Sequence, residues 1–169
     1  EVNKIKVNPI KVKEPLFSSN PELFPFWFQV VSLIGGRGFG KTTLCLNLLL
    51  LQKQYIDKVY IVSPNAGTDT KVLSVLKDGF NYVLYEDLNA KTVEDIQSDI
   101  DRRIKLYKDA KTLLKIIKKI KNRRLAVLTD EEDDFLEKLN VEDIPEMISL
   151  YNEGRPPTSV LWIDDQVGS

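Results

Sequence analysis

The sequence contains no histidine, so no imidazole is available as a general base, nucleophile or metal ligand. Any catalysis must therefore depend on carboxylates and lysine. Cysteine occurs once, at Cys45, which excludes a disulfide within this sequence. Because Cys45 lies in an apolar stretch, we expect a buried thiol without a chemical role.

Long hydrophobic runs are also missing. The longest ones, such as Leu48–Leu51, are far short of the roughly 20 apolar residues that a membrane-spanning helix needs. The first residues lack the pattern of a secretory signal, so a cytosolic-type location without membrane contact is expected. The formal net charge of -1 gives no overall attraction to nucleic acid, which leaves only local patches as candidates for such binding.

The chain begins with extended and irregular features. Residues 1–14 alternate apolar and basic side chains, and prolines then precede an aromatic group within residues 24–28. We therefore expect an N-terminal arm and aromatic lead-in over residues 1–28, followed by one α/β domain over residues 29–169. The aromatic group is expected to plug one end of the sheet rather than to hold an adenine ring.

Short apolar runs bounded by turn residues predict a mostly parallel sheet flanked by helices. The first strand is Gln29–Ile34, and the leucine-rich stretch Thr42–Gln54 predicts a buried helix after it. Lys58–Val62 predicts the next strand, so these three elements form a βαβ unit. Tyr82–Tyr85 and Ser159–Ile163 predict two further strands.

The middle of the chain is strongly charged. Val93–Arg124 has helical periodicity, and from Arg102 onward its charged residues are basic apart from Asp109. The stretch from Asp130 to Glu146 is acidic apart from Lys138. The favoured interpretation is a pair of neighbouring helices whose solvated faces attract each other weakly; the alternative is a basic helix that faces DNA phosphates.

A glycine-rich motif carries the clearest chemical signal. Gly35–Thr42 has the sequence GGRGFGKT, which fits G-x-x-x-x-G-K-T, and it lies between an expected strand and an expected helix. Glycines permit backbone conformations that a Cβ opposes, so successive amides can point at phosphates near the positive end of the helix. The residues expected to bind the nucleotide are Gly35, Gly36, Arg37, Gly38, Phe39, Gly40, Lys41, Thr42 and Thr43.

Three side chains of this motif have more specific expectations. Lys41 would bring a mobile charge to the β- and γ-phosphates of ATP. The Thr42 hydroxyl would take one position in the shell of a magnesium ion, which prefers oxygen ligands and keeps several waters. Arg37 would either reach the phosphates or a neighbouring subunit, or point into solvent.

A second motif, Val160–Asp165, combines four apolar residues with two carboxylates. Next to a P-loop, Asp164 is expected to hold magnesium, and Asp165 is expected to polarise the water that attacks the γ-phosphate. The predicted catalytic residues are thus Lys41, Asp164 and Asp165. Ser63 and Asn65 follow a strand on the side where ligands of open α/β sheets bind, so either one could touch the attacking water.

The chain resembles the poxvirus-type genome-packaging ATPases of large DNA viruses and virophages, which belong to the FtsK-HerA superfamily of P-loop ATPases. The resemblance covers about residues 24–65 and 158–166. It is carried by the segments FPFWFQVVSLIGGRGFGKTTLCLNLLL, DKVYIVSPN and SVLWIDDQ, and above all by the GxxGxGKTT loop and the double aspartate.

The resemblance implies an additional-strand ATPase fold and a homo-oligomeric ring that uses ATP and Mg²⁺ to drive double-stranded DNA into a preformed capsid. A capsid or portal component would then be a partner, in the cytoplasmic viral factory of an infected cell or in the virion. Lys41, Thr42, Asp164 and Asp165 would inherit the phosphate, magnesium and water-activating roles. The family continues with strands beyond the double aspartate, so C-terminal strands are expected to be missing. The long interval between Lys41 and Asp164 implies a helical insertion at about residues 93–150.

Other functions compete with this interpretation. Asp165–Gly168 also fits the DxxG pattern of GTPases, although the long spacing and the missing Asn-Lys-x-Asp element argue against a GTPase. A P-loop kinase would need an acceptor pocket and an arginine-rich lid. The non-enzymatic alternative is a nucleotide-gated DNA-binding or assembly module without efficient turnover.

Overall fold

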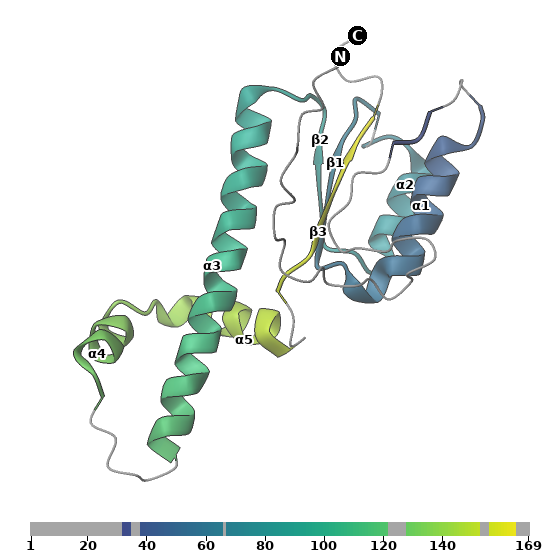
Figure 1. Ribbon diagram of the computed structural model, residues 1–169. Coiled ribbons are helices and arrows are strands. Elements are labelled where there is room, and N and C mark those ends of the chain that lie inside the picture. Colours follow the sequence, from purple (N-terminus) through teal and green to yellow (C-terminus); the bar gives the residue numbers. More distant parts are fainter. Residues whose placement is uncertain (1–31, 35–37, 66, 122–127, 153–155, 165–169) are drawn as a thin grey trace, which may run out of the picture. The chain divides into compact units, whose positions relative to one another are not determined.

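The chain divides into two compact units, which span residues 1–52 and 53–169. The larger unit contains a parallel sheet and most of the helices, which makes the fold α/β, as the sequence predicted. The computed structural model (Figure 1) describes residues 32–34, 38–65, 67–121, 128–152 and 156–164.

Three parallel strands form the sheet of the larger unit, in the order β2-β1-β3. They are β1 (Lys58–Val62), β2 (Tyr82–Tyr85) and β3 (Ser159–Ile163), with the bounds that their apolar runs predicted. β1 is central, because it pairs with β2 along one edge and with β3 along the other. Every residue of β1 after Lys58 is accordingly buried.

Helices cover both faces of this sheet. α2 (Thr70–Lys77) connects β1 to β2, and α3 (Ala90–Lys121) begins the connection from β2 to β3. The two connections run in opposite directions across the sheet, so right-handed crossovers place their helices on opposite faces, as Figure 1 shows. α2 is absent from the predicted elements; the Asp69 carboxylate caps it by accepting hydrogen bonds from the first amides.

α3 belongs to two hydrophobic cores. Its first turns pack on the sheet, where Ile96 lies against Tyr60 of β1. Its second half packs on α5 (Ile144–Asn152), where Leu106 and Met147 share a buried cluster. The single long helix therefore ties the sheet to the helical segment that follows.

The helix predicted over Val93–Arg124 is confirmed as α3 over the residues described. It begins earlier, at Ala90, because the Asn89 side chain accepts a hydrogen bond from the Thr92 amide at 2.9 Å and caps the first turn. Residues 122–124 of the predicted helix lie outside the described residues.

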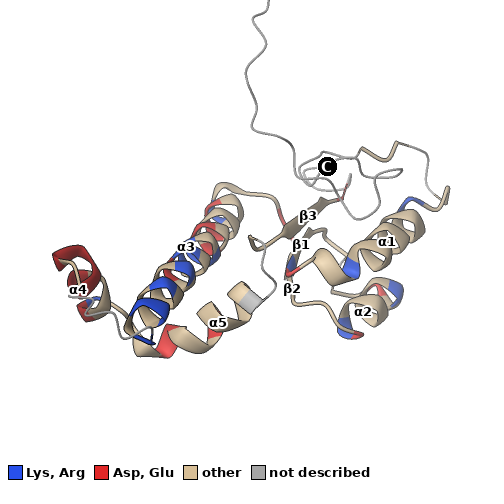
Figure 2. Cartoon of the chain, turned by 60° about the horizontal axis from the view of Figure 1, so that its bottom comes forward, with Lys and Arg blue, Asp and Glu red and all other residues tan. Residues whose placement is uncertain are grey.

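The acidic segment forms α4 (Asp130–Glu137), a short 3-10 helix (Val141–Asp143) and α5. Thr129 and Glu132 begin α4 with a capping box, and the wholly acidic first turn complements the positive end of the helix dipole. Figure 2 shows the resulting contrast between the basic part of α3 and the acidic α4. Among the described helices, none combines the length and apolar character that crossing a bilayer demands.

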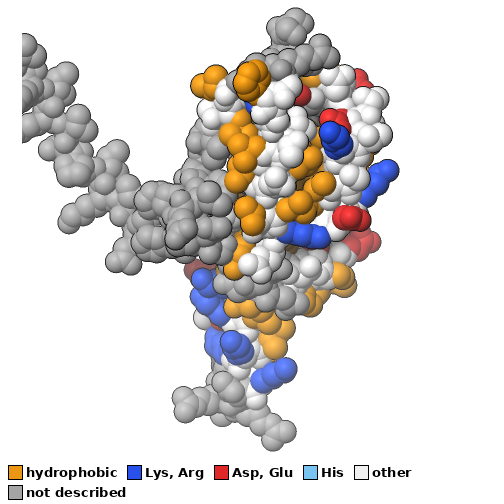
Figure 3. Space-filling view, turned by 90° about the vertical axis from the view of Figure 1, so that its right-hand side faces the viewer, with side chains coloured by type: hydrophobic (Ala, Val, Ile, Leu, Met, Phe, Trp, Pro, Cys, Tyr) orange, Lys and Arg blue, Asp and Glu red, His pale blue; other side chains and the backbone are white. Residues whose placement is uncertain are grey.

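The smaller unit contributes α1 (Lys41–Gln52), which confirms a helix directly after the glycine-rich turn. It ends at Gln52, before the predicted end, and a 3-10 helix (Lys53–Tyr55) follows. Burial is less complete than predicted: Leu46 and Leu49 are buried, while Leu44, Leu50 and Leu51 are exposed. Figure 3, which views the side where α1 lies in Figure 1, shows hydrophobic side chains at the surface.

The strand predicted over Gln29–Ile34 is not confirmed. Residues 29–31 lie outside the described residues, and residues 32–34 form no strand. Ile34 is 97% exposed, so the prediction of a buried strand is wrong for this part of the run. An apolar run gives a strand only where a neighbouring strand supplies hydrogen bonds, and the run itself does not encode that neighbour.

The packing of α3 on α5 predicts unequal effects of two adjacent substitutions. Met147→Ala should lower the free energy of unfolding by about 2–5 kcal/mol, because Met147 is 1% exposed and its loss leaves a cavity. Ile148→Ala is the matched control, because Ile148 is 47% exposed, and its effect should stay within about 0.5 kcal/mol. Urea unfolding followed by circular dichroism measures both, and equal effects would contradict this packing.

Candidate functional site

The carboxyl ends of β1 and β3 bring together two residues that are far apart in the sequence. Ser63 follows β1 and Asp164 follows β3, and the parallel pairing places both at the same edge of the sheet. The Ser63 hydroxyl donates a hydrogen bond to Oδ2 of Asp164 at 2.9 Å. The Asp164 amide donates to the Val62 carbonyl, also at 2.9 Å, so backbone and side chain fix this carboxylate together.

Ser63 is the centre of this arrangement. It is buried, and its amide donates to the Tyr85 carbonyl of β2 at 2.9 Å. Its hydroxyl oxygen accepts the Asn65 amide at 3.3 Å, which leaves the hydroxyl proton directed at Asp164. The serine thus orients the carboxylate from a rigid position that involves all three strands.

The strand order places this pair at a topological switch point. From β1 the chain goes first to β2 on one side and later returns to β3 on the other, so the two connections leave opposite faces of the sheet. Ligands of open α/β sheets bind outside the carboxyl ends of the strands at such points. Ser63 and Asp164 lie at this edge of the sheet. The contact of Ser63 or Asn65 with the attacking water and the magnesium role of Asp164 stay predictions.

The described part of the glycine-rich loop has the backbone that the motif predicts. Gly38 and Gly40 have φ angles of 84° and 81°, which side chains with a Cβ rarely adopt. A Cβ at either position would meet no atom within 4 Å, so conformation rather than crowding requires glycine here. The Gly40 carbonyl accepts the Leu44 amide at 2.9 Å, so α1 begins immediately after the turn.

The side chains at the start of α1 differ in exposure. Lys41 is half-buried, whereas Thr42, Thr43 and Phe39 are exposed. Gly35, Gly36 and Arg37 lie outside the described residues, and so does Asp165. The predictions for these four residues remain predictions.

The two halves of the predicted site belong to different units. Gly38–Thr43 is part of the first unit, whereas Ser63 and Asp164 are part of the second. The shared magnesium ion predicted for Thr42 and Asp164 therefore stays a prediction.

The donor set at the sheet edge suits a hard cation. Asp164 offers carboxylate oxygens and Ser63 a hydroxyl oxygen, which are the ligand types that Mg²⁺ prefers. Within the described ranges no group of three or more acidic or thiol side chains could hold a metal by itself. An ion here would take most of its ligands from phosphate and water, as Mg²⁺ commonly does.

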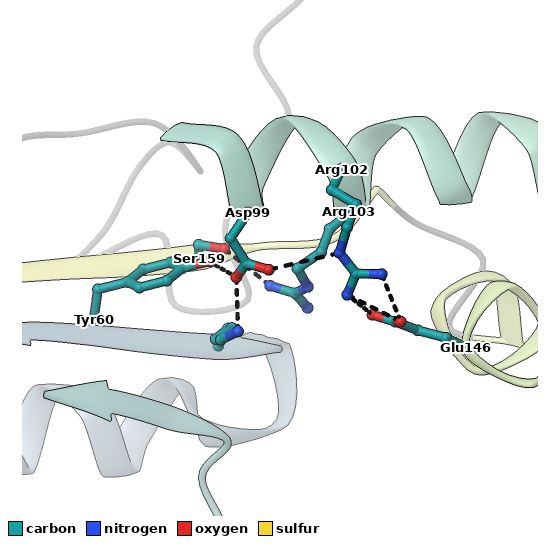
Figure 4. Close-up of polar contacts among 7 residues, drawn as sticks. Tyr60, Asp99, Arg102, Arg103, Glu146 and Ser159 are labelled. Atoms are coloured by element: carbon teal, nitrogen blue, oxygen red, sulfur yellow. Dashed lines mark hydrogen bonds and ion pairs between the residues drawn. The ribbon is translucent and has the colours of Figure 1, made fainter. Parts of the chain in front are cut away.

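A second polar cluster, which the sequence did not predict, lies at the opposite end of the strands (Figure 4). Asp99 of α3 accepts hydrogen bonds from Lys58 at 2.6 Å and from the Tyr60 hydroxyl at 2.5 Å. The buried Arg103 donates to the Ser159 hydroxyl at 3.1 Å. These contacts anchor α3 to the amino-terminal ends of β1 and β3.

The cluster extends to α5, and its contacts change the pKa values of Tyr60 and Asp99. Arg102 binds Glu146 of α5 through two guanidinium nitrogens, at 2.8 and 3.0 Å. Burial and the hydrogen bond to Asp99 raise the pKa of Tyr60, which keeps its hydroxyl neutral. Burial opposes ionisation of Asp99, but the hydrogen bonds from Lys58 and Tyr60 and the nearby positive charges outweigh it and lower its pKa.

This cluster connects elements rather than forming a reaction centre. Each of its charged groups has a protein partner, and its members come from β1, β3, α3 and α5. The sequence does show charged residues at the starts of strands and on one face of the predicted helix. It does not show which of them pair, because the partners are 39 to 56 residues apart.

Comparison of the chain with protein-family models, with curated proteins and with solved structures finds no match. The functional interpretation therefore depends on the residues of the chain itself.

The lowered pKa of Asp99 predicts a pH-dependent contribution to stability. Because its folded pKa lies below its unfolded pKa, the contribution is fully present above the unfolded value and is lost as pH falls through the folded value. Asp99→Asn should cost roughly 2 kcal/mol at pH 7 and progressively less below about pH 4. Urea unfolding from pH 7 to pH 3 measures this change.

Asp101→Asn is the matched control for that prediction, because Asp101 is exposed on the same helix and, within the described part of the chain, accepts a hydrogen bond from Gln97 alone. Its effect should be small at every pH. A cost of Asp99→Asn that does not diminish in acid would contradict the assigned ion pair.

Proposed function

We propose that this chain is an ATP-binding and ATP-hydrolysing motor module of the additional-strand P-loop type, which acts on double-stranded DNA with Mg²⁺ as cofactor. The observation that carries the proposal is the glycine-rich turn, where Gly38 and Gly40 have positive φ angles and lead directly into α1. The Lys-Thr pair of the motif stands in the first turn of that helix.

The phosphate-binding step follows from this backbone. Amides at the start of a helix have no partners within the helix and lie at the positive end of its dipole, so they attract a phosphate chain. Lys41 would add a full positive charge to the β- and γ-phosphates. The exposure of Thr42 and Thr43 is consistent with hydroxyl groups that a nucleotide or its magnesium ion could reach.

The hydrolytic step assigns roles to the sheet edge. Asp164 and Thr42 would hold magnesium, which neutralises charge that develops on the phosphates, and Asp165 would polarise the attacking water. Ser63 would act as a positioning residue, because its hydroxyl orients the Asp164 carboxylate. Asn65, whose amide donates to the Ser63 hydroxyl oxygen, would be a second residue near the attacking water.

The choice of a DNA-packaging motor is supported by the resemblance of the P-loop and double-aspartate segments to genome-packaging ATPases. Such a motor would work as a homo-oligomeric ring with a capsid or portal partner. The strongly basic second half of α3 gives the chain a local surface that suits a polyanion despite the net charge of -1.

Nucleotide binding tests the P-loop assignment. Lys41→Ala should weaken the binding of MgATP at least tenfold in calorimetry, because it removes the charge that faces the β- and γ-phosphates. Lys71→Ala on α2 removes the same type of charge from an exposed position outside the motif and should leave affinity unchanged. GTP titrated in parallel separates an ATPase from a GTPase. Absence of MgATP binding to the unmodified chain would overturn the proposal.

Turnover tests the sheet edge. Ser63→Ala should reduce kcat for ATP hydrolysis by about 10–100-fold with a smaller change in KM, as loss of a group that orients a metal ligand does. Asp164→Asn and Asp165→Asn should reduce kcat further. Ser74→Ala is the control, because Ser74 is an exposed serine of α2 whose hydroxyl donates a hydrogen bond to the Lys71 carbonyl of its own helix. Wild-type turnover in Asp165→Asn would remove that residue from the mechanism.

A further inference from the structure

Four lysines line one side of the second half of α3. They occur at intervals of three and four residues, which places side chains on one face of a helix. All four are exposed. We call this surface the lysine stripe; it consists of Lys108, Lys111, Lys115 and Lys118.

The lysine stripe points away from the packed side of the helix. Leu106 and Ala110, on the other side, are buried in the cluster with Met147 and Leu150 of α5, and Leu113 packs against that cluster. At 100° per residue these positions lie opposite the lysines. Figure 2 marks basic residues in blue along this part of α3.

The acidic segment does not neutralise the lysine stripe. Among the described residues, the four ammonium groups make no hydrogen bond or ion pair, whereas neighbouring basic residues do. Lys119 binds Glu132 of α4 at 2.6 Å, and Arg102 binds Glu146 of α5. The weak attraction expected between the basic and acidic helices is thus limited to specific pairs outside the stripe.

The spacing and chemistry of these lysines fit a linear polyanion. Ten residues separate the first lysine from the last, so the four charges span about 15 Å of helix. Duplex DNA carries a phosphate about every 3.4 Å along each strand, so this length matches several consecutive phosphates. Lysine ammonium groups are point charges without the planar fork of arginine, so they suit backbone contacts that are independent of base sequence.

A membrane surface fits less well. An interfacial helix needs a free apolar face to insert between lipids, and the apolar face of α3 is occupied by α5 and by the sheet.

We propose that the lysine stripe is a surface that contacts the phosphate backbone of double-stranded DNA. The choice of duplex DNA among polyanions rests on the proposed motor function; the cationic surface itself does not.

Salt-dependent DNA binding tests this inference without nucleotide. Fluorescence anisotropy with a labelled 20-base-pair duplex, at several salt concentrations, gives the slope of log K against log salt for the full chain. The variant Lys111→Gln/Lys115→Gln/Lys118→Gln should flatten that slope by about 2.7, because each lost phosphate contact contributes about 0.9. Lys119 is left unchanged because it holds α4.

The control variant is Lys71→Gln/Lys77→Gln/Lys91→Gln, which removes the same charge from exposed lysines outside the stripe. It should retain the slope of the unmodified chain, and both variants should keep its urea midpoint to within the effect of surface substitutions. An equal slope change in both variants would overturn the inference. So would failure of the unmodified chain to bind the duplex at low salt, or binding to anionic vesicles in place of DNA.

MgATP titrations of the same proteins separate this inference from the proposed ATPase. The expected result is that the stripe variant shows a flatter dependence of DNA binding on salt and binds MgATP as the unmodified chain does. A chain that binds DNA through the stripe but binds no MgATP would overturn the ATPase and leave the surface assignment intact. If the chain binds MgATP but the stripe variant has the same salt slope as the unmodified chain, the surface assignment is overturned and the ATPase proposal is not.

Discussion

The pairing of β1 with β3 is the contact on which the rest of the larger unit depends. It joins segments about a hundred residues apart, and both ends of the ladder carry polar groups with defined partners. At one end Lys58 pairs with Ser159 beside the cluster that anchors α3, and at the other end Val62 and Ile163 precede Ser63 and Asp164. A shift of one residue would send every β3 side chain to the opposite face and separate the serine from its carboxylate.

The two halves of α3 differ in what they contact. Its first half is held between charged groups and apolar side chains of the sheet, so its register is fixed by Asp99 and Arg103. Its second half packs against α5, and the side that carries the lysine stripe is exposed to solvent. Arg102 and Lys119 have acidic partners on α5 and α4, whereas the lysine stripe lies between these two residues and is exposed.

The sequence predicts features that are encoded locally and misses those that depend on distant partners. The strands of the sheet are short apolar runs between turn residues, and the glycine-rich turn is a contiguous motif, so both could be recognised. The position of Ser63 at the carboxyl end of its strand was also predicted, but its hydrogen bond to Asp164 was not, because the sequence does not show which strands are neighbours. The Lys58–Asp99–Tyr60 cluster was missed because no periodicity links a strand start to a helix forty residues later. The strand predicted at residues 32–34 was wrong because an apolar run alone does not supply the neighbouring strand with which it would pair.

The length of α3 beyond its anchor gives the molecule mechanical leverage. Arg103 binds β3, and the helix continues from there to Lys121, a distance of about 27 Å at the normal helical rise. A tilt of about 10° at the anchor would displace the far end of the helix by about 5 Å, which exceeds the spacing of successive base pairs. α5 would travel with it, because the two helices share a core. In the proposed DNA motor, a small rearrangement at the sheet would therefore move the lysine stripe by a distance on the scale of one base-pair step.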